Sequence, residues 1–377
     1  MYWPASAWLP SPVMPVSSLD AHGHEWRAGL RFPWPTPPAN GEVQAVAEGM
    51  LWLRMPLPFG LDHINLYLLK HAQGWVAVDT GLNNRQTRDA WERVFEQVLG
   101  GLPLLAVICT HFHSDHVGVL GWLTERFRCP VFMSASEYQA MHQLGANNDP
   151  SSSWAFREHY RRAGLSTEQT EALFPLLNSA HFRPQVPTSF HRLSEGSELN
   201  IGGRRWQVRI GRGHSPEHAC LYCAEDQLLI AGDQVLPRIT SSVCVQVTEP
   251  DANPLREWLD SIEGLRGVPD DVLVLPAHER PFFNLHLRLD QLRDHHLVHL
   301  QQLLDACTAP RSAAQLMAVL FPKVNGQFDE LMALGETLAH LNYLIAQGQL
   351  GREEIDGVFR YGRTPVGAVA RPVLGQL

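Results

Sequence analysis

Short apolar runs alternate with amphipathic stretches through the middle of the chain. The runs are rich in Val, Ile and Leu: INLYLL (64–69), WVAVDTG (75–81), LLAVICT (104–110), WQVRIG (206–211), QLLIAG (227–232) and DVLVLP (271–276). Apolar runs of this length, bounded by turn residues, are typical of buried strands. Helical periods at 84–98 and 117–127 lie between them. Strands that alternate with helices in this way predict an α/β domain.

The alternation of apolar runs and helical stretches stops at both ends of this region. Residues 1–42 are rich in proline and tryptophan, with PWPTPP at 33–38, and we expect an extended N-terminal arm. The α/β pattern occupies residues 43–285. Beyond them the strands stop, and helical periods cover 286–307, 312–321 and 328–347. We therefore expect residues 286–377 to form a small C-terminal helical domain that ends in a short hairpin.

Residues 134–192 interrupt the α/β domain. They carry helical patterns such as SSWAFREHYRRAG and STEQTEALFPLLN, each beginning with serines that can cap a helix. This stretch predicts a helical insertion, and insertions of this kind often cover an active site.

Composition and charge narrow the classes of function. The formal net charge of −9 disfavours a phosphate-backbone partner, which normally meets a basic face. The expected reading helix of the C-terminal domain, 328–347, contains no Arg or Lys, so nucleic acid is not the expected partner. Only Lys70 and Lys323 are lysines, which leaves little for Schiff-base or P-loop chemistry.

Cysteine usage and hydropathy indicate the cellular setting. The six cysteines lack the short regular spacing of a disulfide framework, which favours a reducing compartment. Cys220 and Cys223 form a C-x-x-C, but on extended backbone they point to opposite faces, which disfavours a redox or zinc role. No segment reaches the ~20 apolar residues of a membrane span, and the N-terminus does not resemble a signal peptide. We expect a cytoplasmic protein without membrane association.

Histidines and aspartates follow the ends of four predicted strands. The first of these strands leads into THFHSDHVG (110–118), and single residues follow three others. In open α/β sheets, sites collect at the carboxyl ends of strands, so these side chains are expected to converge. They are His111, His113, Asp115, His116, His214, Asp233 and His278.

Seven such side chains exceed the needs of one zinc ion, which takes about four ligands, so a pair of metals is the natural count. His111 and His113 are two apart on extended backbone and face the same way, which suits one ion. Asp115 and His116 come one step later and suit a second ion. Asp233 is the candidate bridge, because a carboxylate has two oxygens. Histidine and carboxylate without cysteine favour zinc, with iron or manganese as alternatives.

Five separated motifs together resemble the metallo-β-lactamase superfamily over about Val43 to Phe283. The motifs are VDTG with Asp79, THFHSDH, GHSPEH with His214, AGDQVL with Asp233, and PAHE with His278. The resemblance implies a four-layer αββα sandwich with a dinuclear site. It places His111, His113 and His214 on the first metal, Asp115, His116 and His278 on the second, and Asp233 between them. Asp79 corresponds to the carboxylate that fixes a ligating imidazole.

The resemblance also suggests a branch of the superfamily. A bridging aspartate is similar to the glyoxalase II, lactonase and phosphodiesterase branches rather than to the true β-lactamases. Residues 286–377 resemble the winged-helix-like domain of the lactamase-β-like-2 group, some of whose members cut RNA. In this chain the tail's charge balance favours a scaffold or homo-oligomer contact over nucleic-acid binding.

Three functions follow, in order of preference. The first is metal-dependent hydrolysis of a small-molecule ester, thioester, lactone or phosphodiester by a metal-activated hydroxide, with Asp115 orienting the nucleophile and Asp233 bridging. The second is an iron-dependent dioxygenase, and the third is an endoribonuclease.

Other polar residues near these motifs have ordinary explanations. His218 lies four residues after His214 and fits either a supporting or a packing role. Arg238 follows the bridging aspartate and fits a surface position better than a substrate contact. A solvated or interhelical face is expected for His295, His296 and His299, which share a long helical period.

Overall fold

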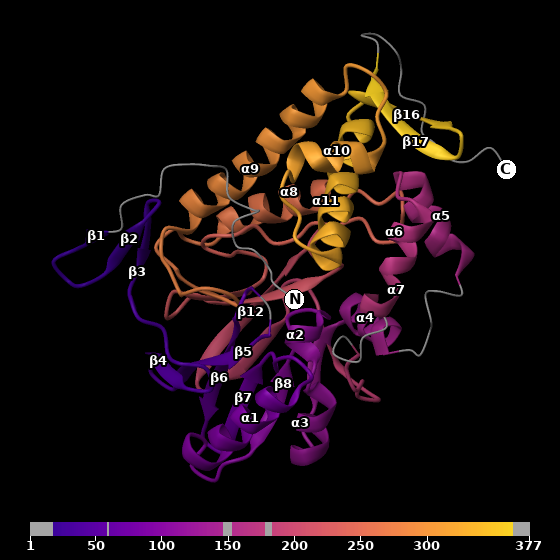
Figure 1. Ribbon diagram of the computed structural model, residues 1–377. Helices are drawn as coiled ribbons and strands as arrows, with labels where there is room; N and C mark the ends of the chain where they lie inside the picture. The colour runs from indigo at the N-terminus through magenta and orange to yellow at the C-terminus, as the bar shows by residue number, and fades with distance from the viewer. Residues whose placement is uncertain (1–17, 59, 146–152, 178–182, 365–377) are drawn as a thin grey trace. The chain divides into compact units, whose positions relative to one another are not determined.

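The computed structural model describes residues 18–58, 60–145, 153–177 and 183–364 (Figure 1). The chain divides into two compact units, each assembled from separate segments. Unit 1 comprises Met1–Asn148, Ser179–Ser241 and Asp260–Gln291, and unit 2 comprises Asp149–Asn178, Ser242–Leu259 and Leu292–Leu377. All eight residues of the predicted metal site fall in unit 1.

A seven-stranded sheet forms one half of unit 1, in the order β10-β9-β8-β7-β6-β5-β4. Its strands are β4 (Val43–Ala47), β5 (Met50–Pro56), β6 (His63–His71), β7 (Gly74–Val78), β8 (Leu104–Ile108), β9 (Val131–Ser134) and β10 (His191–Leu193). Strands β4 to β7 are antiparallel, and β7 to β10 are parallel. The apolar runs at 64–69, 75–81 and 104–110 therefore form β6, β7 and β8, as predicted.

A five-stranded sheet forms the other half, in the order β11-β12-β13-β14-β15. Its strands are β11 (Glu198–Ile201), β12 (Arg204–Gly211), β13 (His218–Cys223), β14 (Leu228–Gly232) and β15 (Leu273–Pro276). Only β14 and β15 pair in parallel within this sheet. The remaining three predicted runs are β12, β14 and β15, and the C-x-x-C lies on β13 with both cysteines free and buried.

Two apolar layers explain why both faces of the larger sheet are hydrophobic. Neighbouring residues of β5 point to opposite faces, so Trp52 enters the core shared with the five-stranded sheet and Leu53 enters the core under the helices. The first core also takes Trp206 from β12. The second is covered by α1 (Arg85–Gln97), α3 (Leu120–Phe127) and α4 (Ala135–Gly145), which contribute Trp91, Leu123 and Met141 among others. This layering holds the strand ends of the two sheets in fixed positions.

The described part of the N-terminal arm is more regular than the extended segment that its composition suggests. Strands β1 (Ser18–Leu19), β2 (Glu25–Arg27) and β3 (Leu30–Phe32) form an antiparallel sheet. Ala28 and Gly29 both have positive φ, the backbone that a two-residue hairpin requires. Leu30 and Phe32 are buried, so the arm packs rather than staying solvated. Residues 1–17 of the predicted arm lie outside the described residues.

Unit 2 is mainly helical and ends in a hairpin. Its helices include α5 (Trp154–Ala163), α6 (Thr167–Ala172), α7 (Phe174–Leu177), α10 (Ala313–Leu320) and α11 (Gln327–Ala346), and its hairpin is β16 (Leu350–Ile355) with β17 (Val358–Arg363). The predicted serine caps are present, because Ser153 is the N-cap of α5 and Ser166 is the N-cap of α6. The division between the units passes through α8 (Pro254–Gly264) and α9 (Leu285–Ala306).

The short α2 (Ser114–Val117) belongs to unit 1, as does a single 3₁₀ turn at Leu265–Gly267. Among the described residues, no helix combines the length and the apolar character needed to cross a bilayer.

Candidate metal centre

The predicted site residues all follow strand carboxyl ends in unit 1. Asp79 follows β7, the THFHSDH segment follows β8, and His214 follows β12. Asp233 directly follows β14, and His278 comes two residues after β15. The parallel strands end on the same side of their sheets, so residues up to 199 positions apart meet in one place.

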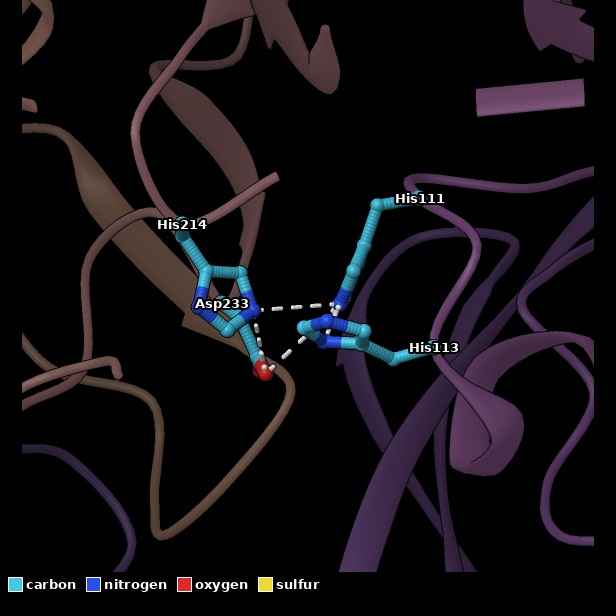
Figure 2. A group of neighbouring side chains, drawn as sticks. All are labelled: His111, His113, His214 and Asp233. Carbon is cyan, nitrogen blue, oxygen red and sulfur yellow. Dashed lines mark hydrogen bonds and ion pairs between the residues drawn. The ribbon is translucent and has the colours of Figure 1, made fainter. Parts of the chain in front are cut away.

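The first group consists of His111, His113, His214 and Asp233, whose donor atoms lie within 4.8 Å of one another (Figure 2). Nε2 of His111 lies 2.9 Å from Nδ1 of His113 and 3.2 Å from Nε2 of His214. Two nitrogens on one tetrahedral zinc, each at about 2.0–2.1 Å from it, would be separated by roughly 3.3 Å. The three imidazoles therefore have the spacing of ligands to a shared ion.

The second group consists of Asp115, His116 and His278. Nε2 of His116 and Nε2 of His278 lie 3.9 Å and 3.5 Å from Oδ2 of Asp115. Asp233 faces both groups. Its Oδ2 lies 3.4 Å from Nε2 of His214, and its Oδ1 lies 3.4 Å from Nε2 of His278.

Asp79 fixes the orientation of His116. Its Oδ2 accepts hydrogen bonds from the Thr110 hydroxyl and from Nδ1 of His116, both at 2.8 Å, and its Oδ1 accepts from the Thr110 backbone N–H at 2.8 Å. With the proton of His116 held at Nδ1, its Nε2 presents a lone pair toward the site. Nδ1 of His278 likewise donates to the backbone oxygen of His63 at 2.9 Å, which leaves its Nε2 facing Asp233.

Two buried atoms at the centre lack a hydrogen-bond partner among the described residues, namely Nε2 of His116 and Oδ1 of Asp233. Buried polar atoms are normally satisfied, so two unsatisfied ligand atoms at this centre fit a site for a cation. Burial and the neighbouring histidines hold the pKa of His111 well below its usual range, which keeps its ring in the neutral form that can bind a metal. Burial opposes a charge on His116, yet Asp79, Asp233 and Asp115 raise its pKa well above normal, so the carboxylates around this ring favour a positive charge there, which a metal ion on Nε2 would supply in place of a proton.

Burial also disfavours the charge on Asp233, but His278 and His116 outweigh it and hold the pKa of Asp233 well below its usual range. The carboxylate is therefore ionised, as a bridge requires. The donor set consists of imidazole nitrogens and carboxylate oxygens, which suits zinc, iron or manganese.

His218 supports the bridging aspartate, a role that the sequence left undecided. It is fully buried on β13, and its Nε2 accepts the backbone N–H of Asp233 at 3.0 Å. Burial lowers the pKa of His218 to about 3, so the ring stays neutral and can accept. Its spacing from His214 was the one signal in the sequence, and that spacing fits a packing role equally well.

The sequence offered no reason to single out Glu137 on α4, which the structure places beside the metal centre. Its Oε1 accepts from the Ser215 hydroxyl at 2.6 Å and the Glu217 backbone N–H at 2.7 Å, and its Oε2 accepts from the Phe112 backbone N–H at 3.0 Å. One buried carboxylate thus ties the segment after β8 to the segment after β12. Nothing in the sequence distinguishes this residue from an ordinary helical glutamate.

Side chains of β6 hydrogen-bond to the backbone of the segment that carries His278. Nδ2 of Asn65 donates to the backbone oxygens of Pro276 and Glu279, both at 2.9 Å, and the Tyr67 hydroxyl donates to Pro276 at 2.8 Å. Arg238 pairs with the Glu279 carboxylate, which agrees with the expectation that it is not a free substrate contact.

The chain is similar to known proteins in both sequence and structure. The family model of the metallo-beta-lactamase superfamily matches residues 59–278, and that of the metallo-beta-lactamase-like C-terminal domain matches residues 300–364. A beta-lactamase domain protein from Burkholderia ambifaria is similar in structure, with a TM-score of 0.82 and 41% sequence identity over 89% of this chain and 98% of that chain.

Similar curated proteins include several hydrolases. A probable metallo-hydrolase of Bacillus subtilis (strain 168) is 23% identical over 80% of this chain and 93% of its own length. An acyl-coenzyme A thioesterase of Homo sapiens is 25% identical over 51% of this chain and 65% of its own length. A hydroxyacylglutathione hydrolase of Idiomarina loihiensis is 24% identical over 48% of this chain, and the match spans half of that relative.

Proposed function

Because the chain belongs to the metallo-β-lactamase superfamily, we propose that it uses two divalent metal ions to hydrolyse a small-molecule ester, thioester, lactone or phosphodiester. The family, the mixed α/β fold and the hydrolase class are those predicted from the sequence, and the comparisons confirm these three points. The ligand assignment, the number of ions and the substrate are proposed.

The placement of Asp233 is the observation that carries the proposal. Its Oδ1 lies 3.4 Å from Nε2 of His278, and its Oδ2 lies 3.4 Å from Nε2 of His214 and 3.5 Å from Nε2 of His116, so one carboxylate reaches both groups of histidines. We assign the first ion to His111, His113 and His214, the second to Asp115, His116 and His278, and the bridge to Asp233. Zinc is the favoured ion, with iron or manganese as alternatives.

Bound divalent ions at this centre would supply a hydroxide at neutral pH and hold the oxygen that gains negative charge. Two of the seven ligands, His113 and Asp115, keep partial solvent exposure, while the other five are buried. A substrate thus meets the centre on the side of these two residues. Asp115 is placed to orient the attacking water and to accept its proton at a carboxylate oxygen.

Thioesters come first among the four substrate classes. Two of the similar proteins are named for such substrates, an acyl-coenzyme A thioesterase and a hydroxyacylglutathione hydrolase, and an acyl group on coenzyme A or glutathione is joined through a thioester. Nucleic acid is not the proposed partner, because α11 presents no Arg or Lys along its length. The cytoplasm remains the proposed location, since thioesters of this kind and six free cysteines both suit a reducing compartment.

The test combines metal analysis with a substrate panel. The full chain is stripped with a chelator, reloaded with zinc, manganese or iron, and assayed on chromogenic thioester, lactone, phosphodiester and carboxyl-ester substrates. We expect hydrolysis that disappears with the metal and returns with it, and loss of both metal and activity in Asp233→Ala and His113→Ala. The matched controls are Asp89→Ala and His22→Ala, which alter exposed residues.

Three results would count against the proposal. Hydrolysis that survives chelation would remove the metal from the reaction. Iron near one ion per chain together with thiol-dependent oxygen uptake would indicate the dioxygenase alternative. Cleavage of RNA with no turnover of the small substrates would indicate the endoribonuclease.

A further inference from the structure

A second cluster of histidines and one glutamate lies in unit 2, away in sequence from the centre described above. Helix α9 carries the adjacent His295 and His296 and, one turn later, His299, and α11 carries Glu336 and His340 one turn apart. Sequence periodicity predicted a solvated or interhelical face for the three histidines of α9. The structure places His296 fully buried against α11, while His295 and His299 are partly exposed.

The nitrogens of His296 and His340 have the spacing found in the metal centre. Nδ1 of His296 lies 3.1 Å from Nε2 of His340, compared with 3.2 Å between His111 and His214. Nδ1 of His340 donates to the backbone oxygen of Glu336 at 2.8 Å. The neutral ring of His340 therefore has its lone pair at Nε2, and this atom points at His296.

Glu336 is the unusual member of the cluster. Its side chain is fully buried, and neither carboxylate oxygen has a hydrogen-bond partner among the described residues. Nε2 of His296 and Nδ1 of His299 are likewise buried without a partner there. An ionised carboxylate is strongly disfavoured in such a place unless a cation or a donor compensates it, and burial accordingly raises the pKa of Glu336 well above normal.

We propose that His296, Glu336 and His340 bind a further, structural metal ion in unit 2, with zinc as the preferred occupant. One donor atom from each lies within 4.8 Å of the other two, and all three residues are buried. His295 and His299 form a neighbouring triad with the same glutamate and can supply a further ligand. Facing helices of a bundle often build metal sites from ligands spaced by one turn.

The ion would hold α9 to α11 within unit 2. Its ligands come from two helices that are far apart in sequence, so binding favours the folded state over the unfolded chain, where no preformed site exists. A buried position closed by protein ligands suits a structural role rather than catalysis.

The first test compares metal content in matched variants of the full chain. Wild-type protein and Glu336→Gln are loaded with zinc, desalted and analysed by mass spectrometry of the elements. We expect Glu336→Gln to hold one zinc ion fewer per chain and to gain less thermal stability from zinc than the wild type does. Glu330→Gln makes the same change six residues earlier on α11, and we expect it to match the wild type. Equal zinc content in all three proteins would overturn the proposal.

A second variant keeps the proposal testable if Glu336→Gln does not fold. The triple variant His111→Ala/His116→Ala/Asp233→Ala removes ligands from both groups of the metal centre in unit 1 and leaves the cluster in unit 2 intact. After zinc loading and desalting, we expect this protein to retain one zinc ion per chain. A protein that folds and retains none would show that the cluster holds only protons.

Discussion

His218 accepts the backbone N–H of Asp233 through Nε2 at 3.0 Å, so an uncharged imidazole supports the residue that faces both groups of proposed metal ligands. The Ser241 hydroxyl donates to the backbone oxygen of the same aspartate. Both backbone polar groups of Asp233 are therefore hydrogen-bonded to side chains. These bonds fix the backbone from which the carboxylate projects, without the help of a water molecule.

Replacing His218 should weaken metal binding without touching a ligand. In His218→Ala the Asp233 N–H loses its acceptor, and we expect the affinity for zinc to fall about 10- to 100-fold, as is typical when a partner of a ligand is removed. Competition with a chromophoric chelator measures the change. His286→Ala removes a ring that bonds to the Val268 backbone oxygen instead of to a metal-site residue, and it should leave the affinity unchanged. Unaltered affinity in His218→Ala would mean that the hydrogen bond does not position the carboxylate.

Gly232 leaves the space that His218 needs. Its φ is +50°, and a Cβ there would lie 2.5 Å from two ring atoms of His218. We expect Gly232→Ala to lower the free energy of unfolding by about 1–2 kcal/mol for the left-handed backbone and by a further ~1–3 kcal/mol for the clash. Gly100→Ala is the control, because φ is +62° and nothing lies within 4 Å of its Cβ. Denaturant unfolding that gives equal losses for the two variants would show that the ring moves away freely.

Asp79→Asn should release one ion selectively. The Asp79 carboxylate accepts the Nδ1 proton of His116, and an amide nitrogen in its place would favour the tautomer with the proton on Nε2, the atom that faces the site. We expect zinc affinity at the second group to fall about 10- to 100-fold while the first group retains its ion. Zinc titration followed by elemental analysis distinguishes the two. Asp89→Asn on α1 serves as the control, and simultaneous loss of both ions would contradict the selective role.

Glu137 should make stability depend on pH. Burial raises its pKa from 4.5 to about 7 in the folded protein. An acid with a raised folded-state pKa contributes stability that is complete below about pH 4.5 and is lost as the pH rises through about 7. Relative to Glu137→Gln, the free energy of unfolding of the wild type should therefore fall by about 3 kcal/mol between pH 4.5 and 8, at 1.36 kcal/mol for each pKa unit.

Urea unfolding of the metal-free proteins at several pH values measures this difference, because titrations shared by the two proteins cancel. Glu96→Gln, which changes an exposed glutamate on α1, should show no such trend. A constant difference between the wild type and Glu137→Gln across the range would show that Glu137 stays ionised.

Much of the fold could be predicted because its signals are local. An apolar run bounded by turn residues predicts a strand wherever it occurs, and all six predicted runs became strands of the two sheets. The N-terminal arm shows the limit of this reasoning. Its proline and tryptophan content suggested an extended segment, but the turn at Ala28 and Gly29 and the burial of Leu30 produce a small sheet.

The sequence by itself determined the family, the fold class and the types of donor at each strand end, because residue identity and periodicity are properties of short segments. Only the tertiary structure decided which side chains support those donors and which other polar groups are buried together. Glu137 supports the site through partners about 80 residues away. In unit 2, Glu336 of α11 is buried beside histidines of α9. Such relationships depend on which side chains lose solvent together, and burial is a property of the packed chain that no short segment encodes.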